Sequence, residues 1–257
     1  MATMAASTRP IGGDDRFFLI SAAMMAAVLG AGFSLHLAAG RSSFSAPLLV
    51  HVHALVFFGW VAIYVAQNAL AASGSIALHR KLGWIAAGWV VAMVVLGTAI
   101  TVVNVRRGAA PFIFRPQHFL IFNPLTVLFF AGLTAAAIAM RRRTDWHRRL
   151  HFCGMALLLG PGFGRLLPMP LLIPYAFQAT FVALMLFPLA GIAADLRRSG
   201  RVHPAWWTGV GVMLFFFALS EVVPQSAIGS ALYAWVTAGS PGAIIPGLAF
   251  PMPPPMA

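Results

Sequence analysis

The chain has 257 residues, of which 60% are hydrophobic and 9% charged, and its mean hydropathy is +0.87. Soluble domains carry about 25% charged residues, so this composition excludes a soluble globular protein and indicates an integral membrane protein of the all-α class. The net charge of +12 is typical of basic cytoplasmic loops and is not taken as a sign of nucleic-acid binding.

The chain divides into a polar head (1–16), a membrane domain (17–225) and a tail rich in glycine and proline (226–257). Long apolar runs predict seven transmembrane helices, and the second to the fifth are expected to form a four-helix core. Gly160-Pro161-Gly162 is expected to break the fifth span, and a short interfacial helix is expected at 227–237. The predicted spans are 17–39, 48–72, 82–105, 117–140, 145–167, 171–194 and 205–223.

Basic residues predict the orientation of these spans. With seven spans, one side of the membrane receives twelve of the seventeen basic residues and the other side receives five. The positive-inside rule places the richer side, and with it the N-terminus, in the cytoplasm and the tail in the periplasm of a bacterial inner (cytoplasmic) membrane. The five on the outer side are Arg41, Arg106, Arg107, Arg115 and Arg165.

The second span has one polar and aromatic face. Its members recur at offsets of about one, two, three and four helical turns: His53, Phe57, Trp60, Tyr64 and Gln67. Imidazole and amide groups are unfavourable in lipid, so this face is expected to point into the bundle. His51 lies two residues from His53, about 200° around the helix, so the stripe selects His53 as the inward histidine.

The histidines fall into two groups, one near each membrane surface. A haem requires one or two imidazole ligands that face each other across a gap between helices, and one haem per surface would let electrons cross the membrane. Arg165, fourteen residues after His151, is a candidate partner for a haem propionate, a quinol or the carboxylate of Glu221. The outer group is His36, His51, His53 and His118; the inner group is His79, His147 and His151, with His203 in an inner loop.

This layout resembles the ascorbate-reducible di-haem cytochromes b, over about 100 residues from His51 to His151. The resemblance implies one or two b-type haems, with His53 (or His51) paired to His118 and His79 paired to His151 (or His147). The chain is also similar to a family of uncharacterised bacterial membrane proteins, whose elements here are His51-Val-His53, Trp60, Gln67, His79-Arg80-Lys-Leu-Gly83-Trp84, Asp145-Trp-His147-Arg-Arg149-Leu150 and Gly164-Arg165.

The leading prediction is therefore a b-type haem protein that moves electrons in the membrane, a transmembrane oxidoreductase whose partners are the lipid bilayer, quinol or a redox protein. One alternative is a transporter or assembly factor for a metal or haem. It would use the outer histidine cluster as transient ligands, and convergence of His36, His53 and His118 on one point would favour it. The candidate ligands for copper, zinc or iron are His51, His53, His118, His79, His147 and His151. A second alternative is a membrane di-iron enzyme, for which only the His147-x-x-x-His151 pair fits.

Overall fold

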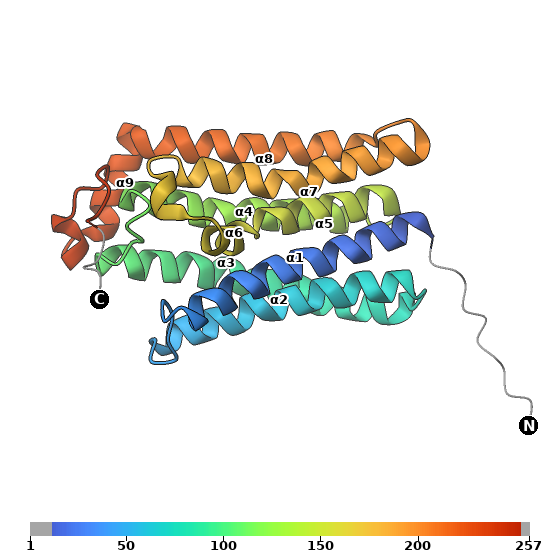
Figure 1. Ribbon diagram of the computed structural model, residues 1–257, viewed down its shortest axis with the longest axis horizontal. Helices are drawn as coiled ribbons and strands as arrows, with labels where there is room; N and C mark the ends of the chain where they lie inside the picture. The colour runs from blue at the N-terminus through green and yellow to red at the C-terminus, as the bar shows by residue number, and fades with distance from the viewer. Residues whose placement is uncertain (1–11, 253–257) are drawn as a thin grey trace, which may run out of the picture.

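The computed structural model describes residues 12–252, and every regular element in this range is a helix (Figure 1). The longer helices run side by side in one elongated bundle, and the short ones connect them or cap one end. The α-helices are α1 (Gly13–Ala38), α2 (Leu48–Ala72), α3 (Ile76–Arg106), α4 (Pro116–Ala139), α5 (Thr144–Leu157), α6 (Gly160–Leu166), α7 (Ala176–Ser199), α8 (Pro204–Val222) and α9 (Ala227–Thr237). The 3-10 turns are η1 (Met169–Leu172), η2 (Val223–Gln225) and η3 (Pro241–Ile244).

Six helices in the described range are long and apolar enough to cross a membrane: α1, α2, α3, α4, α7 and α8 with η2. This fits a multi-pass membrane protein. Each of them has at least 22 residues in the membrane-spanning stretch, and about 20 are enough to span the hydrocarbon core at helical rise. The predicted second span agrees with α2 at both ends.

The two ends of the bundle differ in charge. The connections α2–α3, α4–α5 and α7–α8 lie with the start of α1 at one end, which we call the basic end because it holds Arg80, Lys81 and Arg141 to Arg143. The connections α1–α2 and α3–α4 and helix α9 lie at the opposite end, which we call the far end. Residues 144–175 return the chain from the basic end to the far end.

The predicted fifth span is present as two helices. Helix α5 ends at Leu157 and α6 begins at Gly160, so the break falls just before Gly160-Pro161-Gly162. Neither piece alone is long enough to cross a membrane, since α5 has 14 residues and α6 has 7. Helix α6 packs closely against α1 at a point where each helix has a glycine. A Cβ on Gly32 of α1 would overlap the carbonyl of Gly162 of α6.

The predicted sixth span is shifted along the chain. The segment 171–194 was expected to be helical, whereas α7 begins at Ala176 and continues to Ser199. Pro168, Pro170 and Pro174 lack amide hydrogens and disfavour helical geometry in the residues before them, so this stretch forms only the turn η1. The shift places Asp195 inside the last turns of α7, where its carboxylate is buried.

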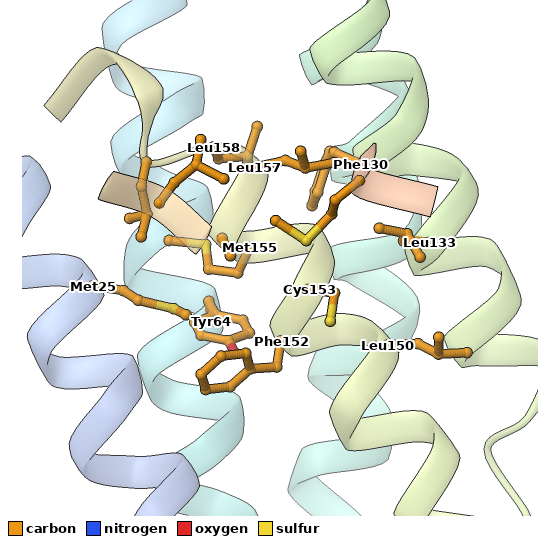
Figure 2. Close-up of a cluster of buried hydrophobic side chains, with 14 of the residues drawn as sticks. Met25, Tyr64, Phe130, Leu133, Leu150, Phe152, Cys153, Met155, Leu157 and Leu158 are labelled. Carbon is orange, nitrogen blue, oxygen red and sulfur yellow. The ribbon is translucent and has the colours of Figure 1, made fainter. Parts of the chain in front are cut away.

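Helix α5 lies at the centre of the bundle, because α1, α4, α7 and α8 all pack against it. Its residues from Phe152 to Leu157 are all buried. Figure 2 shows the side chains of this helix surrounded by Met25 of α1, Tyr64 of α2 and Phe130 of α4. Neighbouring pairs α2–α3, α3–α4 and α4–α5 pack in chain order, as expected for the four-helix core, but α5 serves the whole bundle and not that core alone.

Candidate functional site

Three histidines come together at the basic end. The rings of His79, at the start of α3, and His147, at the start of α5, have centroids 6.1 Å apart with their planes at 77°. His151 follows one turn later on α5, and its ring lies 4.7 Å from that of His147. Helices α3 and α5 each pack closely against α4, and these imidazoles bridge the space between them. The structure thus assembles the inner histidine group that the sequence predicts.

Two of these imidazoles are held in a fixed orientation by backbone carbonyls. Nδ1 of His79 donates to the carbonyl oxygen of Gln67 at 3.2 Å, and Nδ1 of His147 donates to that of Ala137 at 2.8 Å. In a neutral imidazole the other nitrogen, Nε2, is then the one with a free lone pair. Ligand histidines in metalloproteins are oriented in the same way, by a hydrogen bond from the nitrogen that does not bind the metal.

Gln67 adds an unpaired acceptor to this group. Its backbone carbonyl orients His79, and its side-chain Oε1 is buried without a hydrogen-bond partner. Within residues 12–252, no three side chains of His, Cys, Asp or Glu converge closely enough to hold a bare metal ion. What the basic end offers is therefore two oriented imidazoles on facing helices, a third imidazole behind them, and one buried amide oxygen.

The polar and aromatic face of α2 points inward, as its spacing predicts. Trp60 and Tyr64 are the two buried residues of α2. His53 stacks on Phe57 at 4.2 Å, and its Nδ1 is buried without a partner. His51 instead bonds the carbonyl of Phe44 in the exposed α1–α2 connection.

The far-end histidines lie against different helices. His118 of α4 packs between Phe122 and Phe177, with ring centroids 5.0 and 4.8 Å away, and so faces α7. The charge of Arg165, whose guanidinium lies over the ring of Phe33 at 3.8 Å, acts on His53. Within residues 12–252 the ring contacts of His53 and His118 are with phenylalanines, and the pairing of the two histidines stays a prediction.

Arg165 and Glu221 do not form the ion pair considered from the sequence. The Arg165 guanidinium donates to the carbonyl of Pro161 at 2.9 Å. Glu221 of α8 accepts from the Gln178 amide of α7, also at 2.9 Å. The sequence could not reveal this partner, because the offset between α7 and α8 depends on where α7 begins.

The far end contains a cavity of about 270 Å³ between α4, α7 and α8. The charged, imidazole and amide side chains in its lining are those of Arg115, His118, Gln178, Glu221 and Gln225. Nε2 of His118 and Oε1 of Gln178 are buried and have no hydrogen-bond partner. The aromatic rings on its wall are those of Phe114, Tyr175, Phe177 and Phe250.

A buried ionic network at the basic end was missed by the sequence reasoning. Arg149 of α5 forms a two-pronged ion pair with Asp195 of α7, Nη2 to Oδ1 at 2.7 Å and Nε to Oδ2 at 3.0 Å, and both side chains are buried. Trp206 of α8 also donates to Asp195, at 3.0 Å. Asp195 is the one acidic residue between positions 146 and 220. An isolated acid at the end of an apolar run is the sequence signal that indicates a buried, paired carboxylate here.

The network extends to α1 and to the start of α5. Arg148 binds Asp14 and, at 2.8 Å, Asp145, while Arg198 binds Asp14 at 3.0 Å. Asp145 lies in the first turn of α5, where a carboxylate complements the helix dipole, and it also pairs with Arg148. In the nearby connection, burial together with the charge of Arg149 lowers the pKa of His203. The acidic groups here are satisfied by arginines, which is typical of a structural network.

Comparisons of this chain with family models, with curated proteins and with solved structures found no match.

Proposed function

We propose that this protein is a b-type haem protein that carries electrons in the membrane, with one haem bound at the basic end between His79 of α3 and His147 of α5. The observation that supports it most is the separation of the two rings. Two imidazoles that bind one metal ion from opposite sides have ring centres about 6 Å apart, because each nitrogen lies about 2 Å from the ion and each ring centre about 1 Å beyond its nitrogen. The two rings lie 6.1 Å apart.

The residues around this pair have complementary roles. The carbonyls of Gln67 and Ala137 would hold the Nδ1–H groups and present both Nε2 atoms to the iron. A bound haem would supply one-electron chemistry, whose potential depends on burial and on hydrogen bonds near the ligands. Gln67 Oε1 would accept a hydrogen bond at this site. The ring of His151 lies 4.7 Å from that of His147 on the same helix, and we assign it a supporting role.

We also infer that the chain crosses the membrane seven times, with residues 144–175 as a broken fifth crossing and the basic end in the cytoplasm. The charge difference between the two ends supports this orientation. A broken helix is tolerated at membrane depth when it is buried in protein, and α5 is the central helix of this bundle. A bacterial inner membrane is the proposed location.

A second haem at the far end draws no support from the contacts, because the rings of His53 and His118 pack on phenylalanines and not on each other. The alternative of a metal-handling protein relies on His36, His53 and His118 converging, and the placement of His118 beside α7 does not favour it. The di-iron alternative relies on His147 and His151 alone, and both belong to the site already assigned to haem. One haem at the basic end is the proposal that the geometry supports best.

The test is the reduced-minus-oxidised visible spectrum of purified variants. His79→Ala and His147→Ala should each remove the haem bands, since each removes one axial ligand. His151→Ala and His118→Ala should retain them and serve as matched histidine controls. Loss of the bands in His151→Ala together with their retention in His147→Ala would transfer the ligand role to His151 and contradict the assignment.

A further inference from the structure

The far-end cavity has the features of a ligand site that the haem proposal does not use. It lies between α4, α7 and α8, while the histidine group at the basic end lies at the opposite end of the bundle. Its volume of about 270 Å³ is at the lower limit of ligand pockets, which run from about 300 to 1,000 Å³. It therefore suits one substituted ring and is too small for a macrocycle.

The polar groups in this cavity call for a ligand that donates hydrogen bonds. Gln178 Oε1 is an acceptor, and His118 Nε2 is one in the tautomer that carries its proton on Nδ1; both atoms are buried without a partner, which is unfavourable unless something binds them. One N–H of the Gln178 amide is already used, because it donates to Glu221 at 2.9 Å. A ligand with two hydroxyl groups would satisfy the two free acceptors.

Charge and shape narrow the class of ligand further. The lining holds one basic and one acidic side chain, Arg115 and Glu221, whose charges offset each other, so a neutral ligand is favoured. Phe177 and Phe114 provide aromatic surface on the cavity wall, against which a flat ring packs well. Glu221 is also the one acid of the chain outside the basic-end network, and it accepts a hydrogen bond from the side-chain amide of Gln178 in the cavity lining.

The tail helps to close the cavity. Leu248 and Phe250 contribute to its lining, and the guanidinium of Arg115 lies 5.1 Å from the centre of the Phe250 ring. The tail is fixed there by the backbone of Gln117, whose N–H donates to the carbonyl of Gly247 at 2.9 Å. Gln117 itself is buried and its amide donates to Pro224, so this cover is attached to the start of α4.

We propose that this cavity binds the ring of a membrane quinol, with His118 and Gln178 accepting hydrogen bonds from its hydroxyl groups. The inference rests on the proposed electron-carrying function and adds a quinol ligand to it; it assigns no electron transfer between this cavity and the haem at the opposite end, and the binding itself does not require haem. It predicts a preference for the reduced form, because a quinone has no hydroxyl hydrogens to donate to these two acceptors.

The experiment is isothermal titration calorimetry of the purified full chain in detergent, without oxygen, with a short-tailed benzoquinol and then with the matching quinone. We expect the quinol to bind about tenfold or more tightly than the quinone, the effect of one lost hydrogen bond to a buried acceptor. His118→Phe, which keeps an aromatic ring against Phe122 and Phe177, should weaken quinol binding about tenfold. It should leave quinone binding almost unchanged.

Thr126→Val is the matched control, because its hydroxyl bonds a carbonyl of its own helix α4 outside the cavity. Gln178→Leu gives a second, independent test of the cavity and should also weaken quinol binding. Absent quinol binding, equal affinity for both forms, or unchanged affinity in both cavity variants would overturn the inference. Haem content is measured on the same samples, so that loss of the haem proposal and loss of the quinol site are recognised separately.

Discussion

Asp195 connects three helices through one carboxylate. It accepts hydrogen bonds from Arg149 of α5, from Trp206 of α8 and from the backbone of His203, and it is 4% exposed. A buried charge is tolerated only when its partners satisfy it, and removing one member of a buried ion pair costs more than the pair contributes. This network therefore holds α5, α7 and α8 in register at the basic end.

Asp195→Asn should lower the free energy of unfolding by about 3–5 kcal/mol, because the buried Arg149 guanidinium loses its closest counter-charge and keeps only the longer contacts with Asp145, at 3.4 Å, and Asp14, at 4.0 Å. Denaturant unfolding in detergent, followed by tryptophan fluorescence, would measure this loss. Asp15→Asn is the control: Asp15 is half-exposed and makes one long contact with Arg148, at 3.4 Å, so its removal should cost less than about 1 kcal/mol. Equal losses in the two variants would show that Asp195 is not the centre of the network.

The helices of this bundle approach closely where one of them presents glycine. Gly191 of α7 faces the indole of Trp206, and a Cβ built on Gly191 would overlap that ring. The ring cannot move away easily, because its Nε1 is bonded to Asp195 at 3.0 Å and the side chain is fully buried. The spacing of α7 and α8 is therefore fixed at this glycine.

Gly191→Ala should destabilise the protein by about 1–3 kcal/mol, the usual cost of overfilling a packed interior. Gly88→Ala on α3 is its counterpart, because nothing lies within 4 Å of a Cβ at that position. There the substitution should be neutral or stabilising by up to about 1 kcal/mol, since alanine favours the helix. Thermal unfolding of both variants would measure the difference, and a Gly191→Ala protein as stable as Gly88→Ala would refute the packing argument.

At the scale of the whole molecule, the placement of residues 144–175 decides the topology. If this segment crosses the membrane, residue 172 lies in the periplasm and residue 200 in the cytoplasm. If it does not cross, the two positions exchange sides. Fusions of alkaline phosphatase and of a fluorescent protein after each position would measure this directly. We expect phosphatase activity at 172 and fluorescence at 200, and the opposite pattern would reject the seven-crossing topology.

Much of the architecture could be predicted from the sequence, because apolar length and helical spacing are local properties. The range of α2, the inward face with Trp60 and Tyr64, and the break before Gly160 were all found in this way. The start of α7 could not be predicted from hydropathy, because three prolines in an apolar stretch prevent the helix there. The partners of Glu221 and Asp195 could not be predicted either, because they depend on how distant helices align.

The candidate site was predictable in part for the same reason. His79, His147 and His151 share one end of the bundle because alternate spans start there, and the structure brings their rings together. The pairing of His53 with His118 stays a prediction, which was made for a four-helix core, whereas α5 lies at the centre of a larger bundle and His118 packs against Phe177 of α7. Which helices neighbour one another is a property of the whole fold and not of any one span.

The haem content of the purified protein tests the central claim most directly. The protein is expressed with haem supply, purified in mild detergent, and its haem is extracted into alkaline pyridine and quantified against the protein concentration. We expect one b-type haem per chain. Two haems per chain would mean that the far end binds one after all, and a protein without haem under these conditions would contradict the proposed function.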